Sequence, residues 1–190
     1  MDSMLDLCLK NRYDTDKYLA GSTFWQSPHC YVEHVYSHVF DRMRESCKSL
    51  LEIGVYNGGS ILLWKDYFPN ATIYGVDINI APALNKAIDR VYTTIGDGYT
   101  VQYANSIKNY SFDIIIDDGP HTKESMHKFL QLYSNKVTTN GILVIEDIPD
   151  IELAKQLAVE SFFTSKAKIY DLRHVSNKFD DIVLVMDLGV

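Results

Sequence analysis

Seven short apolar runs, separated over most of the chain by segments of helical periodicity, constrain the fold of this sequence more than any other feature. The runs cover residues 49–53, 72–76, 91–95, 112–116, 142–145, 168–172 and 182–186. The middle runs are nearly continuous in Ile, Leu and Val, which is typical of strands buried on both faces of a parallel sheet. Strands that alternate with helices favour a doubly wound α/β sheet with right-handed crossovers.

The end of the chain follows a different pattern. No helical period separates the last two runs, and residues 173–181 between them are interpreted as a loop. These two strands are therefore predicted to form an antiparallel hairpin at the sheet edge, giving six parallel strands and one reversed strand. Apolar residues at helical spacing predict helices over residues 32–43, 126–133 and 151–162, whereas residues 1–30 are predicted to be irregular.

Charge and cysteine content argue against several classes of protein. The net charge is −7 and no run of five basic residues occurs, which argues against a general nucleic-acid binder. Cys8, Cys30 and Cys47 form no C-x-x-C pair, so neither a disulfide framework nor a cysteine zinc site is expected. Without a secretion signal or an apolar run of 18 residues, we expect a cytoplasmic protein with no membrane or nucleic-acid partner.

A glycine-rich turn follows the first predicted strand, at the end where parallel sheets bind ligands. It comprises residues 52–60, Glu-Ile-Gly-Val-Tyr-Asn-Gly-Gly-Ser. Gly54 permits a tight turn, and Gly58 or Gly59 would let backbone N–H groups approach a ligand. The spacing matches neither the G-x-G-x-x-G dinucleotide fingerprint nor a P-loop. A plain glycine turn remains the alternative interpretation.

Acidic residues also follow the second and third predicted strands. Asp77 comes about twenty residues after the glycines, where an acid can accept hydrogen bonds from ribose hydroxyls. Its alternative role is a helix N-cap. Asp97, after the third strand, is placed to reach an adenine amine.

The fourth and fifth predicted strands end in clusters of acids. Asp117 and Asp118 precede Gly-Pro-His, and Glu146 and Asp147 follow the fifth strand. Adjacent parallel strands would bring these carboxylates together, and like charges so close require a proton or a cation. Oxygen ligands select a hard cation, so Mg²⁺ is predicted, with solvated helix caps as the alternative. His121 is placed to act as a general base.

Together these residues resemble class I S-adenosylmethionine-dependent methyltransferases, and more narrowly the metal-dependent O-methyltransferases of macrolide sugars. The resemblance is carried by residues 15–17, 29–31 with 36, 51–60, 67–77, 95–97, 112–121, 141–147 and 179–181. It implies a Rossmann-like fold and a His121 base with Asp118 beside it. It also implies Mg²⁺ on Asp118, Glu146 and Asp147. The cofactor contacts that it implies are Gly54, Asp77 and Asp97. We also expect cofactor contacts from Lys17, Glu52, Asn57, Gly58 and Ser60.

The resemblance leads to an expected function and organisation. We expect methyl transfer to a sugar hydroxyl of a glycan or glycosylated metabolite. A catechol-type enzyme acting on a small aromatic, and a non-catalytic nucleotide-binding module, are the alternatives. Residues 1–190 are expected to form a single domain, in which residues 1–46 cover the site of a core formed by residues 47–190. The chain would act as a homo-oligomer or as one domain of a larger glycan-modifying protein.

Overall fold

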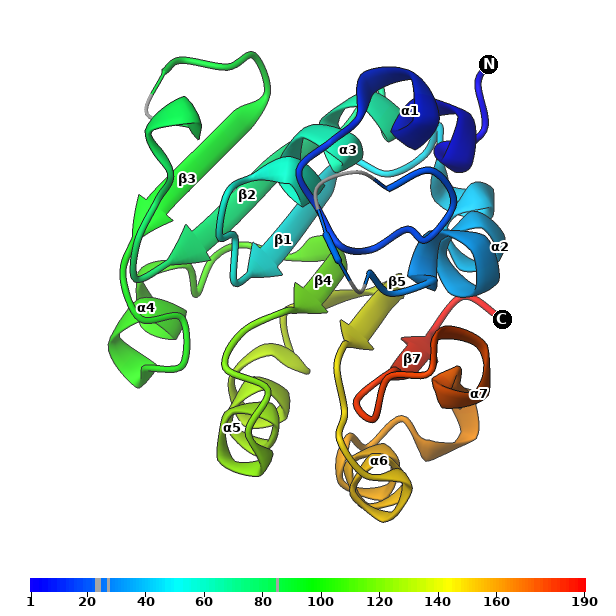
Figure 1. Ribbon diagram of the computed structural model, residues 1–190. Coiled ribbons are helices and arrows are strands. Elements are labelled where there is room, and N and C mark those ends of the chain that lie inside the picture. Colours follow the sequence, from blue (N-terminus) through cyan, green and yellow to red (C-terminus); the bar gives the residue numbers. More distant parts are fainter. Residues whose placement is uncertain (23–24, 27, 85) are drawn as a thin grey trace.

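A seven-stranded sheet forms the centre of the computed structural model, which describes residues 1–22, 25–26, 28–84 and 86–190 (Figure 1). Its spatial order is β3-β2-β1-β4-β5-β7-β6. The strands are β1 (Ser49–Ile53), β2 (Thr72–Asp77), β3 (Val91–Ile95), β4 (Phe112–Asp117), β5 (Val137–Ile145), β6 (Ala167–Asp171) and β7 (Ile182–Asp187). β7 runs antiparallel to both β5 and β6, whereas the other pairs are parallel. The predicted arrangement of six strands in one direction and the last reversed is therefore confirmed.

Helices cover both faces of this sheet, as a doubly wound fold requires. Figure 1 shows α4 (Val101–Ser106), α5 (Lys123–Tyr133) and α6 (Ile151–Glu160) on one face. The other face carries α1 (Met4–Asn11), α3 (Gly59–Tyr67) and α2 (Ser37–Val39). Short helical turns complete the fold: η1 (Val32–Tyr36), η2 (Asp41–Met43), η3 (Pro82–Leu84), η4 (Thr164–Lys166) and α7 (Arg173–Ser176). None of the helices in the described ranges is long and apolar enough to cross a bilayer.

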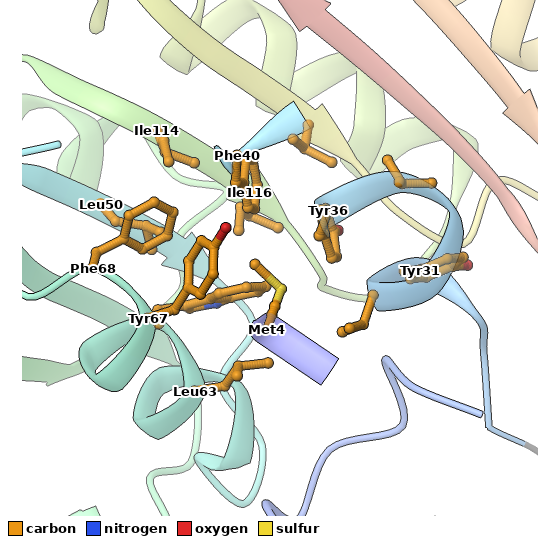
Figure 2. Packing of buried hydrophobic residues seen from close by; sticks show 14 of the residues in the cluster. Met4, Tyr31, Tyr36, Phe40, Leu50, Leu63, Tyr67, Phe68, Ile114 and Ile116 are labelled. Carbon is orange, nitrogen blue, oxygen red and sulfur yellow. The ribbon is translucent and has the colours of Figure 1, made fainter. Parts of the chain in front are cut away.

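The alternation of side chains along each strand divides the core into two layers. Leu50 of β1 packs into the layer that contains Met4 of α1 and Leu63 of α3 (Figure 2). Val144 of β5 belongs to the same layer. Their chain neighbours Leu51 and Leu143 pack into the opposite layer with α5 and α6. Because side chains two positions apart point to the same face, Glu52 lies on the same face of the sheet as Leu50.

The strand register brings the ends of three strands to one level. Ile53 of β1 pairs with Asp117 of β4, and Asp117 pairs with Ile145 of β5. The residues that follow these positions therefore emerge side by side at one edge of the sheet. This edge is where the sequence predicts the site.

The first thirty residues are more ordered than predicted. Ser3 and Asp6 form a reciprocal capping box that starts α1, and Met4 and Cys8 of this helix are buried. Leu5 and Leu7 pack against the same core while only partly buried. The helix has just eight residues, so its apolar period is too short to be recognised in the sequence.

The helix predicted over residues 32–43 is interrupted. Its apolar positions are buried as expected, apart from the partly exposed Val39. The segment Val32–Tyr36, however, is π-helical, with the Ser37 N–H bonded to the carbonyl of Val32 five residues earlier. A 3₁₀ turn, Asp41–Met43, follows.

Two smaller expectations were wrong. The predicted loop 173–181 contains the short helix α7. Phe162 does not share the buried face of α6, because that helix ends at Glu160 and Phe162 turns into left-handed backbone with 93% of its surface exposed.

Candidate active site

A cavity of about 700 Å³ opens at the carboxyl ends of β1 to β5. The turns after these strands form most of its wall, and residues 14–16 and Trp25 of the N-terminal segment complete it. Ligand sites in doubly wound sheets lie at this edge. The predicted site residues on the wall are Gly54, Asn57, Ser60, Asp77, Asp97, Asp118, His121 and Asp147.

The glycine turn is fixed to β2 by Asp77. One oxygen of this carboxylate accepts hydrogen bonds from the backbone N–H groups of Val55 (2.7 Å) and Tyr56 (2.9 Å). The other oxygen accepts from the N–H of Asn79 at 3.0 Å. Asp77 thus shapes the turn after β1 while its side chain lies on the cavity wall.

Gly54 allows the turns after β1 and β4 to touch. Its φ is +94°, and a Cβ there would lie 1.8 Å from the carbonyl oxygen of Asp118. Gly59 is closely approached by the backbone of Asp14, where a Cβ would lie 2.0 Å from the carbonyl oxygen. The glycines of this turn therefore allow close packing of neighbouring segments as well as shaping the cavity.

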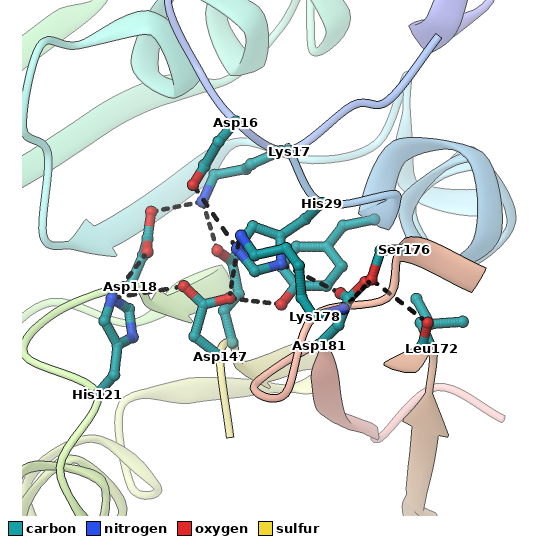
Figure 3. Close-up of polar contacts among 12 residues, drawn as sticks. Asp16, Lys17, His29, Asp118, His121, Asp147, Leu172, Ser176, Lys178 and Asp181 are labelled. Carbon is teal, nitrogen blue, oxygen red and sulfur yellow. Dashed lines mark hydrogen bonds and ion pairs between the residues drawn. The ribbon is translucent and has the colours of Figure 1, made fainter. Parts of the chain in front are cut away.

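Three side chains converge where β4 and β5 end (Figure 3). Nε2 of His121 lies 3.4 Å from Oδ2 of Asp147 and 3.8 Å from Oδ1 of Asp118. One potential ligand atom from each residue lies within 4.8 Å of the others. His121 and Asp147 both have left-handed backbone, with φ of 54° and 53°. Such backbone is uncommon and clusters at functional sites.

The two carboxylates of this cluster each have one oxygen held by the protein. Lys17 Nζ donates to Oδ2 of Asp118 at 2.5 Å, and the hydroxyl of Tyr31 donates to Oδ1 of Asp147. The remaining oxygens are the ones that face His121. Burial raises the pKa of Asp118, and the ammonium of Lys17 opposes this shift.

Glu146 has different surroundings from its neighbour Asp147. Its side chain is 1% exposed, and its two oxygens accept hydrogen bonds from Tyr36 and Lys17. Burial raises the pKa of Glu146 despite the nearby ammonium. Glu146 does not join the group of close ligand atoms that Asp118, His121 and Asp147 form, so its role as a metal ligand stays a prediction.

Three predicted cofactor contacts, Lys17, Glu52 and Gly58, are absent from the described cavity wall. Lys17 is 1% exposed and lies among carboxylates, with Glu52 3.6 Å from its Nζ. Glu52 also accepts hydrogen bonds from Ser60 (2.8 Å) and Trp64 (3.2 Å). The alternation along β1 turns Glu52 into the core layer, and burial raises its pKa to about 7.

His29 and Asp181 contact the site residues, although neither was predicted as a site residue from its chemistry. His29 is buried, with Nδ1 3.1 Å from Asp181 and Nε2 3.3 Å from Asp147. Lys178 also contacts Nε2 of His29. Burial lowers the pKa of His29, but the hydrogen bond with Asp181 and the nearby acids outweigh it and raise the pKa. Sequence reasoning noted His29 and Asp181 only within the family resemblance, since 152 positions separate them.

The chain belongs to a family described as a methyltransferase domain, whose sequence profile matches residues 51–148. This match spans the glycine turn, the acids after β2 to β5 and His121.

The chain is similar in sequence to two curated O-methyltransferases. The chain is 33% identical over 149 residues to the mycinamicin VI 2''-O-methyltransferase of Micromonospora griseorubida, covering 74% of this chain and 35% of that protein. It is 32% identical over 151 residues to the demethylmacrocin O-methyltransferase of Streptomyces fradiae, with the same coverage. The chain spans about a third of the length of these relatives.

A solved structure has the same fold. The MycE methyltransferase of the mycinamycin biosynthetic pathway, solved in complex with Mg, SAH and mycinamycin VI, superposes with a TM-score of 0.72 at 24% identity. The superposition covers 98% of this chain and 53% of that one. The predicted Rossmann-like methyltransferase fold is thereby confirmed.

Proposed function

We propose that this chain transfers a methyl group from S-adenosylmethionine to a sugar hydroxyl of a glycan or glycosylated metabolite, with Mg²⁺ assistance and His121 as general base. One observation carries the proposal. His121, Asp118 and Asp147 line the same cavity as Gly54 and Asp77. Within it, Oδ1 of Asp118 and Oδ2 of Asp147 face His121.

The cofactor end of the cavity would be formed by the turns after β1, β2 and β3. Asp77 retains acceptor capacity beyond its three backbone hydrogen bonds, because a carboxylate offers about four lone-pair sites. It would accept from ribose hydroxyls, and the exposed Asp97 would face the adenine. When bound, S-adenosylmethionine supplies a methyl group that its sulfonium already activates.

The donor chemistry of the second end fits a hard divalent cation. Asp118 and Asp147 each present one oxygen that faces the cavity, with Nε2 of His121 3.8 Å and 3.4 Å away, and carboxylate oxygens are the ligands that Mg²⁺ prefers. Asp118 and Asp147 would hold the ion, with Glu146 as the further ligand that the family resemblance implies. When bound, Mg²⁺ would lower the pKa of a substrate hydroxyl and orient it.

His121 has the position required of a base. Its side chain is 35% exposed and so can be reached by a substrate, and two carboxylates within 4 Å would stabilise the imidazolium that forms. Two further relatives are named as methyltransferases of rhamnosyl and olivosyl compounds, which supports a sugar hydroxyl over a catechol as the acceptor.

Calorimetric titration separates the proposed function from a nucleotide-binding module. We expect S-adenosylhomocysteine to bind and NAD not to bind. Asp77→Ala should weaken the binding of S-adenosylhomocysteine by about 1–3 kcal/mol, which is the cost of leaving a buried polar group unpaired. Tight NAD binding without S-adenosylhomocysteine binding would refute the methyltransferase proposal, and unchanged affinity in Asp77→Ala would remove Asp77 from the ribose role.

Methylation assays with glycosylated macrolides test the metal and the base. Activity should vanish in EDTA and return with Mg²⁺. His121→Ala should lower turnover by roughly 10²–10⁴-fold while S-adenosylhomocysteine still binds. The matched control is His127→Ala, because His127 lies on α5, the helix that begins just after His121, but pairs with Glu160 of α6. Full activity in EDTA, or equal activity of the two histidine variants, would contradict this part of the proposal.

A further inference from the structure

Two buried tyrosines contact the pair of acids that follows β5. The hydroxyl of Tyr31 donates to Oδ1 of Asp147, and the hydroxyl of Tyr36 donates to Oε1 of Glu146. Both tyrosines are fully buried. Because they are neutral donors, they hold one oxygen of each acid without neutralising its charge.

The π-helical turn explains how both tyrosines reach the same strand end. They are five positions apart in the sequence, and at 3.6 residues per turn an α-helix would place them about 140° apart. Winding with hydrogen bonds five residues back instead returns them to one face. The Ser37 N–H bond to Val32 shows this winding, and the Ser37 hydroxyl donates to the same carbonyl at 2.6 Å. The two tyrosine rings lie 6.2 Å apart (Figure 2).

We propose that the π-helical turn is a positioning element of the cation site, in which Tyr31 and Tyr36 fix the orientation of the Asp147 and Glu146 carboxylates. With Oδ1 of Asp147 held by Tyr31, Oδ2 is turned toward His121 and the cavity. The inference rests on the cation site of the proposed function. Tyr31 and Tyr36 act through the acids and are positioning residues rather than catalytic ones.

The hydroxyls and the rings of these tyrosines have separable roles. The ring of Tyr31 stacks on His29 at 4.5 Å, and the ring of Tyr36 stacks on Phe40 at 4.8 Å. A phenylalanine would keep this packing and remove only the hydrogen bond to the acid. Substitution by phenylalanine therefore tests positioning with little loss of core volume.

The test is titration of the full chain with Mn²⁺ alone, followed by calorimetry or by the electron paramagnetic resonance of free Mn²⁺. Tyr31→Phe should weaken Mn²⁺ binding by about 10–100-fold, the usual effect of losing a group that orients a metal ligand. Tyr36→Phe should also weaken Mn²⁺ binding, because it removes the hydrogen bond that orients Glu146. Tyr67→Phe is the matched control, because Tyr67 is equally buried but donates to Asp41 at 3.4 Å. S-adenosylhomocysteine affinity should stay unchanged in all three.

Thermal unfolding distinguishes positioning from a merely structural role. A structural role lowers Tm by the same amount with and without Mn²⁺, whereas a positioning role reduces the increase in Tm that Mn²⁺ produces. If Tyr31→Phe and Tyr36→Phe both bind Mn²⁺ within twofold of wild type, this inference is overturned and the proposed function stands. If the wild-type chain binds no Mn²⁺, the cation site itself fails, and the inference fails with it.

Discussion

At the scale of single residues, Gly54 has the strictest steric requirement in the site. Its left-handed backbone and the contact with the carbonyl of Asp118 leave no room for a side chain. The same close approach sets the position of Asp118 relative to the cofactor turn. One glycine therefore links the two ends of the cavity.

Gly54→Ala should lower the free energy of unfolding by at least about 2 kcal/mol, since it adds backbone strain to a steric clash. Gly96→Ala is the matched control, because a Cβ at Gly96 would meet nothing within 4 Å. The control should change stability by no more than about 0.5 kcal/mol. Urea unfolding measures both, and equal stability of the two variants would contradict the assigned contact.

Glu52 should make stability depend on pH. Burial raises its pKa in the folded chain from 4.5 to about 7, so the folded state keeps this proton where the unfolded state loses it. Its contribution to stability is therefore fully present below pH 4.5 and is lost as pH rises to about 7. Over this range, the stability of Glu52→Gln relative to wild type should rise by on the order of 3 kcal/mol. Urea unfolding of both proteins across the range measures it, and a constant difference would speak against the raised pKa.

At the scale of elements, the start of α5 determines how His121 leaves the sheet edge. Thr122 is the N-cap and accepts a hydrogen bond from the Ser125 N–H at 3.1 Å, while the Ser125 hydroxyl accepts from the Thr122 N–H. This capping box begins the helix directly after the left-handed His121. The orientation of the proposed base is thus tied to the first turn of a helix.

Thr122→Ala should cost about 1 kcal/mol of stability, the usual value of an N-cap. Asp150→Ala, which removes the N-cap of α6, should cost a similar amount. Only Thr122→Ala should also lower turnover, because His121 adjoins that cap. Chemical unfolding and methylation rates of the two variants make the comparison, and an equal effect on turnover would disprove the link between cap and base.

At the scale of the whole molecule, the N-terminal segment belongs to both the core and the site. Met4, Cys8 and Tyr18 lie in the buried layer on one face of the sheet. Lys17 of the same segment is bound to the acids at the strand ends. Removal of this N-terminal segment would expose apolar surface and leave buried carboxylates unpaired, and both changes would destabilise the folded chain.

A chain shortened to residues 31–190 should therefore lose cooperative unfolding and bind a hydrophobic dye such as ANS. S-adenosylhomocysteine and Mn²⁺ should no longer bind to it. Near-UV circular dichroism and dye fluorescence measure the change. Cooperative unfolding of the shortened chain at an unchanged Tm would contradict the expectation that residues 1–190 form a single domain.

The sequence was enough to predict the seven strands, the helices that alternate with most of them, the reversed last strand, and the gathering of Asp118, His121 and Asp147 at one edge. These features follow from local rules, because periodic burial defines each element and parallel strands end at a common edge. The partners of those acids could be seen only in the folded chain. Lys17 lies 101 positions from Asp118, and Tyr31 lies 116 positions from Asp147. No local pattern encodes such distant contacts. The π-helical winding is likewise absent from the apolar period, because the interaction that it serves is a hydrogen bond to a remote strand end.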